Sequence, residues 1–480
     1  MTTDLAKTPD VADLIAALPE GMDQPPMQQD ELAGYLARLA LRPIPAGRLS
    51  RFWILSSLQA KVAAAYLAWW LRKGFVSKEK AAAALNETHL KAALELLGSM
   101  SYLRGAVMKM GQTLATLPNV VPQEFAEALK VLHFEAPPMH FSLLRELVHN
   151  ELGGEVEDLF AEFDTKAFAA ASLGQVHRAR LHDGREVAVK IQYPNIARSI
   201  HADLANMAAL LTPMRLTGGW ANLREQFDDI RTMLDQEMDY VQEAAMQERA
   251  RALFDESDRI VVPAVHHELS SERVLTTDLL VGQHLPAFLA SQPSQADRDQ
   301  FGQLLVNSTF RLMYRGEMCY ADPHPGNYLF LGDGRLGLLD FGCVRMLDDD
   351  DEAKYLMLAG RAMREGGGAM DDLVAQGTNS KDASELTAEH RQLIVDLCEW
   401  LWVPMRHAGP FDFSDPDYFQ RGVDLTAEVM RKRYTQSRPV NTWFNRLFYG
   451  VRAMLYHLTA RADMRAAEER ECSLGPVSPG

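Results

Sequence analysis

Apolar residues recur at helical spacing through much of the first 140 positions of the chain. From Leu49 to about Leu97 the sequence is rich in Ala, Leu and Lys and contains no proline, and a second helical stretch continues to about Leu117. Two prolines then interrupt the pattern before a further helix that begins near Gln123. Residues 1–48 are rich in Pro, Gln and acidic side chains, which predicts a partly disordered leader with at most one short helix.

The pattern changes to strand-like alternation between about Phe160 and Lys190. Two such runs flank the turn residues Asp183-Gly184, and this arrangement predicts a β-hairpin. In the second run, Val187 and Val189 share one face of the predicted sheet, while Lys190 lies on the other face.

Downstream of the hairpin, the sequence contains long helical stretches and short apolar runs, without regular alternation between them. Helices are predicted at 141–152, 195–255 and 298–315 and from about 348 to the Gly/Pro-rich tail, and strands at 260–262, 273–277, 328–331 and 336–339. A Gly-Asp-Gly turn joins the last two strands. A small sheet followed by a helical lobe predicts an α+β fold, because a Rossmann-type sheet would need regular strand–helix alternation.

Composition and charge narrow the function classes. The chain has 480 residues, 47% hydrophobic and 24% charged, which is typical of a globular protein with a sizeable core. A formal net charge of −16 gives no support to general nucleic-acid binding, so no nucleic acid is expected as a partner. The four cysteines form no CxxC pair and no zinc pattern, which fits a reducing cytosol.

The sequence alone does not decide whether the chain contacts a membrane. No apolar run approaches the roughly 20 residues that span a bilayer, and the N-terminus has no secretory signal, so the chain is expected to be cytoplasmic. Aromatic and basic residues mix in the segments 51–55, 66–71 and 443–448. Such segments are typical of interfacial helices and equally of core packing, which leaves a peripheral position at the inner face of a membrane open.

The strongest chemical signal is the pair of segments Asp322-Pro-His-Pro-Gly-Asn327 and Asp340-Phe-Gly342. Phosphoryl transfer needs a group that orients or deprotonates the nucleophile, and oxygen ligands that hold Mg²⁺ against the phosphates. Asp322 suits the first role. Asn327 and Asp340 suit the second, because a hairpin between them would return both to one end. The alternative is a turn-rich loop beside an unrelated Asp-Phe-Gly tripeptide, and the joint spacing favours function.

A second signal is the lysine that ends the apolar strand 186–190. Such a lysine can reach the α- and β-phosphates of ATP when a carboxylate holds it, although a strand-edge lysine is also commonly just solvated. A stretch of small residues lies upstream of it: Ala169, Ala170, Ala171 and Ser172. Its backbone N–H groups and the serine hydroxyl could meet phosphate oxygens, a plain tight turn being the alternative.

Two further clusters have simpler explanations. Glu237, Asp239 and Glu243 form an acidic run that is usually a solvated helix face, but one of them could pair with the strand lysine. Glu243 lies near Asp239 on a helix and away from Glu237. Lys109 and Gln112 share a helix face, where an exposed lysine is the ordinary interpretation.

Taken in order, these segments resemble the UbiB/AarF family of atypical kinases, from about Arg104 to Arg345. Lys109-Met-Gly-Gln112 is similar to the KxGQ signature of that family, and the alanine stretch 169–172 to its alanine-rich nucleotide loop. Glu237-Met-Asp239 is similar to its ExD motif. The nucleotide site that the resemblance implies contains Lys190 with its partner Glu243, the catalytic Asp322, the magnesium ligands Asn327 and Asp340, and adenine-contacting backbone at Asp278 and Leu280.

The resemblance also implies a two-lobed protein-kinase-like fold. A helical N-terminal extension would place Lys109 and Gln112 near the site where a protein substrate would otherwise dock. The expected division is a leader at 1–48, the extension at 49–140, an N-lobe with a helical insertion at 141–282, a helical C-lobe at 283–472 and a disordered tail at 473–480.

For function, the resemblance implies ATP and Mg²⁺ as cofactors, and ATPase-like or small-molecule-directed phosphoryl transfer linked to ubiquinone or other isoprenoid-lipid metabolism. The expected partners are ATP, isoprenoid lipids or quinone precursors, and a membrane surface, with a homodimer left open. Tyr320-Ala321 replaces the His-Arg of ordinary protein kinases, and no Ala-Pro-Glu follows Gly342. The chain is therefore a poor candidate for phosphorylating proteins.

Two alternatives remain open at this point. One is a nucleotide-binding, pseudokinase-like scaffold with little turnover. The other is a protein kinase or a small-molecule kinase such as an antibiotic-phosphorylating enzyme, to whose catalytic loop residues 322–327 are similar.

Overall fold

The structure is a computed structural model, and it describes residues 139–171, 173–194, 196, 231–232, 234–347, 359–360, 362, 367–377, 384, 386–432 and 439–474. Almost all of these lie in one compact unit, formed by residues 138–194 and 232–480. Several predictions from the sequence therefore fall outside the described residues. They concern the leader, the extension with Lys109 and Gln112, Ser172, and the acidic run 348–352.

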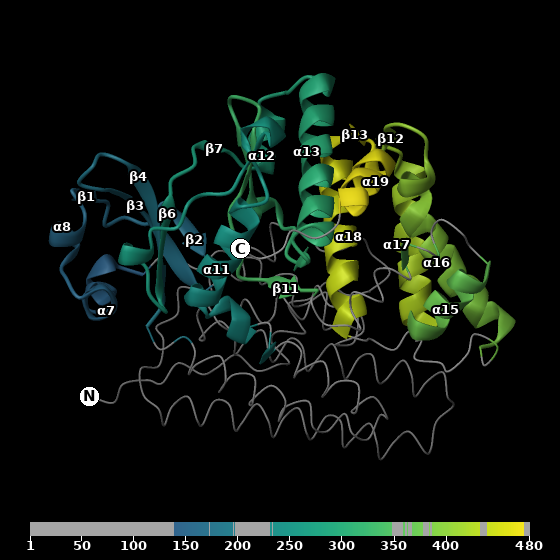
Figure 1. Ribbon diagram of the computed structural model, residues 1–480, viewed down its shortest axis with the longest axis horizontal. Coiled ribbons are helices and arrows are strands. Elements are labelled where there is room, and N and C mark those ends of the chain that lie inside the picture. Colours follow the sequence, from purple (N-terminus) through teal and green to yellow (C-terminus); the bar gives the residue numbers. More distant parts are fainter. Residues whose placement is uncertain are drawn as a thin grey trace, which may run out of the picture. The chain divides into compact units, whose positions relative to one another are not determined.

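The N-terminal lobe is built on an antiparallel sheet with the strand order β1-β3-β4-β6 and with β2 beside β3 (Figure 1). Its strands are β1 (Glu162–Phe163), β2 (Ala169–Ala171), β3 (Gly174–Arg180), β4 (Glu186–Gln192) and β6 (Val274–Asp278). Helices of this lobe are η2 (Phe141–Leu143), α7 (Arg145–Leu152), α8 (Val156–Leu159) and α11 (Tyr240–Arg251). The short η5 (His267–Leu269) precedes β6.

The predicted hairpin is formed by β3 and β4, and its two faces differ as the alternation indicated. Gly184 takes a positive φ of 93° in the turn, a conformation that glycine adopts without strain. Val187 and Val189 are fully buried against η2, α7 and α8 in the core of the lobe. Lys190 points to the opposite face, where it meets α11. The sheet thus separates an apolar face from the face that carries chemistry.

A second sheet belongs to the C-terminal lobe and has the order β5-β10-β9-β7. Its strands are β5 (Ile260–Val261), β7 (Gly282–Gln283), β9 (Tyr328–Leu331) and β10 (Leu336–Leu338). The predicted hairpin of β9 and β10 is present, with Gly334 at a φ of 78° in its turn. β5 pairs in parallel with β10 rather than with the first sheet, although residues 141–282 were predicted to form the N-lobe.

A two-stranded ribbon next to this sheet was not predicted. β8 (Met318–Tyr320) and β11 (Val344–Met346) pair antiparallel and flank the segments that carry the two motifs. Each strand has only three residues, which is too short for an alternation pattern to identify.

In the C-terminal lobe, helix α13 packs against α18 and α19, while α16 packs against α17 and α19 (Figure 1). The helices of this lobe are α12 (Leu285–Ala290), α13 (Gln295–Tyr314), α15 (Gly367–Gly377), α16 (Ala388–Arg406), α17 (Pro416–Lys432), α18 (Pro439–Leu458) and α19 (Met464–Leu474). Within the described part of the chain, no helix is both long enough and apolar enough to cross a membrane.

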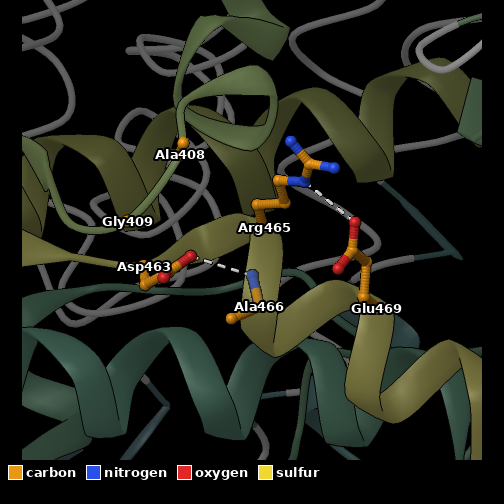
Figure 2. Close-up of a pocket in the computed structure, with 6 residues that line it drawn as sticks. All are labelled: Ala408, Gly409, Asp463, Arg465, Ala466 and Glu469. Carbon is orange, nitrogen blue, oxygen red and sulfur yellow. Dashed lines mark hydrogen bonds and ion pairs between the residues drawn. The ribbon is translucent and has the colours of Figure 1, made fainter.

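The prediction of an entirely helical C-terminal region was wrong at one place. β12 (Phe411–Asp412) pairs with β13 (Arg461–Ala462), because the backbone on either side of α17 and α18 returns to the same point. A shallow pocket of about 270 Å³ lies where α19 begins (Figure 2). Asp463 caps that helix by accepting from the N–H of Ala466 at 2.8 Å, and Arg465 pairs with Glu469. The polar groups of the pocket therefore satisfy one another.

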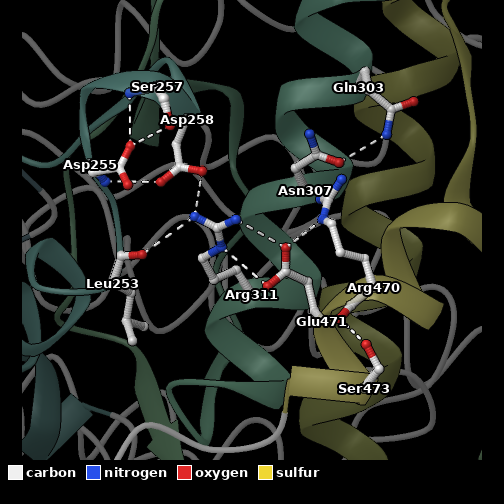
Figure 3. Close-up of polar contacts among 10 residues, drawn as sticks. All are labelled: Leu253, Asp255, Ser257, Asp258, Gln303, Asn307, Arg311, Arg470, Glu471 and Ser473. Carbon is white, nitrogen blue, oxygen red and sulfur yellow. Dashed lines mark hydrogen bonds and ion pairs between the residues drawn. The ribbon is translucent and has the colours of Figure 1, made fainter.

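A buried ion network fixes α19 against α13 (Figure 3). The guanidinium of Arg311 on α13 donates to both carboxylate oxygens of Glu471 on α19, at 3.1 and 3.2 Å. Arg311 also pairs with Asp258 of the 3-10 helix η4 (Glu256–Asp258), and Arg470 contacts Glu471 at 2.9 Å. Because Glu471 is completely buried, its carboxylate is stabilised by these contacts instead of by hydration.

Arg311→Ala is expected to lower the free energy of unfolding by about 3 kcal/mol, since it leaves the buried Glu471 with Arg470 alone. Arg335→Ala removes an exposed pair with Asp333 and serves as the matched control, with an expected change below about 1 kcal/mol. Urea denaturation of both variants measures the difference, and equal effects would contradict this account of the network.

Candidate functional site

The site is centred on Lys190, where the two lobes meet. Its amine donates to both oxygens of Glu243 on α11, at 2.7 and 2.9 Å, and lies 3.3 Å from Asp340 Oδ2. The ring of Tyr240 lies below the amine at 4.9 Å, a cation–π distance. The sequence left open which acid pairs with Lys190, and the structure brings Glu243 to it, as the resemblance implied.

Burial and charge oppose each other in this cluster. Burial lowers the pKa of Lys190, but the carboxylates of Asp340 and Glu243 outweigh it and raise that pKa well above its ordinary value. Burial raises the pKa of Glu243 to about 7 even though Lys190 acts in the opposite direction. Glu243 is only 2% exposed, so its carboxylate depends on Lys190 in place of water. The amine is therefore cationic at neutral pH and positioned to bind an anion.

Asp340 is held by the residues that follow it. Its Oδ1 accepts from the N–H of Gly342 at 2.9 Å, and Phe341 is buried with its ring centroid 5.3 Å from that of Tyr320. The phenylalanine thus anchors the turn in the core while the aspartate points toward Lys190. The carboxylate of Asp340 is 35% exposed, and the site is accordingly open to solvent on this side.

Asp322 and Asn327 form a second centre. Asn327 Nδ2 donates to the backbone carbonyl of Asp322 at 2.8 Å and to its Oδ2 at 3.2 Å. The hairpin brings Asn327 to the end that carries Asp340, because the N–H of Leu339 donates to the Asn327 carbonyl at 3.0 Å. This convergence is the one that the spacing of the motifs predicted.

Arg446 is a residue of this centre that was not predicted. Its Nη2 lies 3.3 Å from Asp322 Oδ1. Burial lowers the pKa of Arg446, and the charges of Cys343, Asp322 and Glu237 outweigh it, so that the pKa is raised overall. The sequence offers little signal for this contact, because 124 residues separate the two partners.

The donors present fit a hard cation. The carboxylate of Asp340 and the amide oxygen of Asn327 are the kind of ligand that Mg²⁺ prefers. Because the amide nitrogen of Asn327 is committed to Asp322, its oxygen is the atom left to coordinate an ion. The described residues contain no cluster of three or more His, Cys, Asp or Glu side chains suited to a metal, and phosphate oxygens and water would complete the coordination shell.

The alanine stretch was predicted to contact phosphate as a loop. In the structure, residues 169–171 are instead part of a sheet. Ala169, Ala170 and Ala171 form β2, paired in register with β3 from Val176 to Gly174. Gly174 closes this hairpin tightly against β4, since a Cβ there would lie 2.2 Å from the carbonyl oxygen of Ile191. Glycine is needed at 174 for this close backbone packing, and Ser172, the polar candidate for a phosphate contact, lies outside the described residues.

The adenine candidates lie at the end of β6. The N–H of Asp278 donates to the carbonyl of Ala264 at 3.0 Å, so a contact of Asp278 with adenine would have to use its carbonyl. Its Oδ1 accepts from His266 Nε2 at 2.9 Å. Leu280 lies two residues beyond Asp278, the last residue of the strand.

The remaining acids of the run are near the site but do not touch Lys190. Asp239 caps α11 by accepting from the N–H of Gln242 at 2.9 Å. The charge of Glu237 is among those that raise the pKa values of Arg446 and Glu243. The structure thus assigns Asp239 a helix-capping role, and the charge of Glu237 acts on one residue of each centre.

A small sheet, a helical lobe and a lysine–glutamate–aspartate cluster between them define a kinase-like protein. The model of the ABC1 atypical kinase-like domain matches residues 131–366. The chain is 31% identical over 278 residues to AarF domain-containing protein kinase 1 of Mus musculus, covering 57% of this chain and 53% of that protein.

Two further similarities agree. Over 401 residues the chain is 30% identical to the mitochondrial atypical kinase COQ8 of Schizosaccharomyces pombe, covering 82% of this chain and 63% of that protein. A solved structure of Mycobacterium tuberculosis, described as the complex of Rv3197 with erythromycin, is 28% identical with a TM-score of 0.53 and covers 82% of this chain and 98% of its own. The chain belongs to the UbiB/AarF family of atypical kinases, and it spans between half and two thirds of the two kinase relatives.

The raised pKa of Glu243 predicts a pH dependence of stability. A carboxyl whose folded-state pKa lies above its unfolded value stabilises the fold fully below the unfolded pKa of 4.5, and this contribution is lost as the pH rises through about 7. Relative to Glu243→Gln, the wild-type free energy of unfolding should therefore fall between pH 4.5 and 7, by at most about 1.4 kcal/mol per pH unit. Urea titrations across this range measure it, and parallel pH profiles would contradict it.

Proposed function

We propose that this chain binds Mg-ATP and transfers the γ-phosphoryl group to water or to a small hydroxyl compound, as an atypical kinase or ATPase that supports ubiquinone or related isoprenoid-lipid metabolism. The observation that carries the proposal is the cluster of Lys190, Glu243 and Asp340, joined by contacts of 2.7 to 3.3 Å. One cation held between a buried acid and a partly exposed acid is suited to receive a polyphosphate and its metal ion.

Each residue then has a separate part in the reaction. Lys190 would bind the α- and β-phosphates, with Glu243 fixing the position of its amine. Asp340 and the amide oxygen of Asn327 would hold Mg²⁺, which neutralises charge on the phosphates when bound. Asp322 would orient the acceptor and accept its proton.

The family and the departures noted in the sequence support a small-molecule acceptor. The COQ8 relative supports a link to isoprenoid-quinone metabolism, and the missing Ala-Pro-Glu segment argues against a peptide substrate. The solved relative in complex with erythromycin supports a small-molecule ligand. A cytoplasmic location with peripheral contact at the inner face of a membrane would bring the site to lipid precursors.

Asp340→Ala is expected to abolish stabilisation by Mg-ATP, because it removes a metal ligand and the second acid beside Lys190. In the wild type, ATP at about 100 times its Kd should raise the free energy of unfolding by about 2.7 kcal/mol. Thermal shift with and without Mg²⁺ measures this. Asp333→Ala, in the turn of the same hairpin, is the control. Identical responses of wild type and Asp340→Ala would refute the site.

Asp322→Asn is expected to retain nucleotide binding and to lower kcat by about 100-fold or more, because the amide cannot accept the proton of the nucleophile. Phosphate release, measured alone and with phenols, isoprenoid lipids or erythromycin added, reports the turnover. Tight ATP binding by a wild type that shows no turnover under any of these conditions would favour the scaffold alternative.

A further inference from the structure

One face of α18 lies along the segment that carries Asp322. Trp443 of this helix stacks under the guanidinium of Arg345 on β11, with Cζ 5.8 Å from the ring centroid. One turn later Arg446 contacts Asp322, and a further turn later Gly450 meets Pro323. The three positions on α18 are three and four residues apart and therefore share a face.

At Gly450 the approach is close enough to exclude any side chain. A Cβ at this position would lie 2.1 Å from Cγ of Pro323 and 3.1 Å from its Cβ. Real Cβ atoms do not come so close to another heavy atom, so the helix or the loop would have to move. Gly450 is not among the described glycines with a positive φ, so the contact, and not the backbone conformation, is what requires glycine here.

A glycine inside a helix is unfavourable by about 1 kcal/mol relative to alanine. The 20-residue helix α18 carries this residue at its twelfth position, with buried Leu447 and Val451 on either side of the contact. The close packing against Pro323, which only glycine permits, therefore accompanies a residue of low helix propensity at this position.

Pro323 transmits any displacement directly to Asp322. The two residues are consecutive, and the proline ring is buried and fixes its own φ, so it cannot swing aside as a flexible side chain would. Asp322 is itself held by Arg446 at one carboxylate oxygen and by Asn327 at the other. A shift of the Asp322-Pro323 segment away from α18 would change the contacts of Asp322 with Arg446 and with Asn327 together.

We propose that Gly450 is a positioning residue for phosphoryl transfer. Because it has no side chain, the Asp322-Pro323 segment can pack closely against α18, and this distance sets the position of Asp322. The inference rests on the proposed function. Gly450 touches neither nucleotide nor acceptor in this proposal. Its effect on the reaction passes through the orientation of Asp322, and displacements of about 1 Å at such a group are enough to lower rates by about 100-fold.

Gly422 on α17 provides a matched control. A Cβ at Gly422 would lie 2.0 Å from Cζ2 of Trp400, which is as severe a contact as that at Gly450, and neither Gly422 nor Trp400 is part of the proposed site. Gly422→Ala and Gly450→Ala should therefore destabilise the protein to a similar degree. A purely structural role for Gly450 predicts that the two variants also have similar activities.

The experiment compares kcat and KM for ATP in the full-length wild type and these two variants, below the melting temperature of each. Gly450→Ala is expected to lower kcat by about 10- to 100-fold while KM for ATP changes by less than about twofold. Gly422→Ala should keep kcat within about threefold of the wild type. Unchanged kcat in Gly450→Ala, or an equal loss in Gly422→Ala, would overturn the inference.

Removal of the opposing ring tests the contact itself. In a Pro323→Ala background the added methyl group at position 450 meets no proline ring, so Gly450→Ala should lower kcat by less than about threefold relative to Pro323→Ala alone. If Gly450→Ala does not fold, the double variant must restore both folding and turnover, and its failure to do so counts against the inference. A wild type without Mg-ATP binding or turnover would instead refute the proposed function, so the two failures are distinguishable.

Discussion

The buried ion pair of Lys190 and Glu243 is the interaction on which the site depends. It joins a strand to a helix within the N-terminal lobe, and the third charge, Asp340, comes from the turn after β10 of the other sheet. The pKa of Glu243 near 7 shows that burial opposes ionisation more strongly than Lys190 supports it. A pair of this kind adds little to stability. In the proposed function, it holds one cation, partly desolvated, where a polyphosphate would displace Asp340 from it.

The C-terminal lobe supplies a second constraint, which acts on the position of Asp322. Asp322 follows β8, and Asp340 precedes β11. Because β8 and β11 pair with each other, both acids are attached to the same short ribbon. Helix α18 packs on β8 and contacts the Asp322-Pro323 segment through Arg446 and Gly450. Helix α13 packs against both α18 and β8 and is itself tied to α19 through Arg311. The geometry of the acids is therefore fixed by helices remote in sequence.

Local features of the site were predictable from the sequence, and contacts between distant segments were not. Glycine turns and alternation identified the hairpins of β3 with β4 and of β9 with β10, and these placed Lys190 on the open face and Asn327 beside Asp340. The capping role of Asp239 could have been inferred from its place just before α11. Nothing local distinguishes Arg446 from any other arginine on an amphipathic helix, and nothing in two residues of β5 specifies a parallel partner 76 positions later.

The central claim is that the amine of Lys190 faces bound nucleotide. The most direct measurement is labelling of the full-length protein with an acyl-phosphate derivative of ATP, which acylates an amine beside the phosphates, followed by peptide mass spectrometry. This account predicts that Lys190 is the main labelled residue and that excess Mg-ATP protects it. Labelling of other lysines with Lys190 untouched, or labelling of Lys190 that Mg-ATP does not reduce, would contradict it.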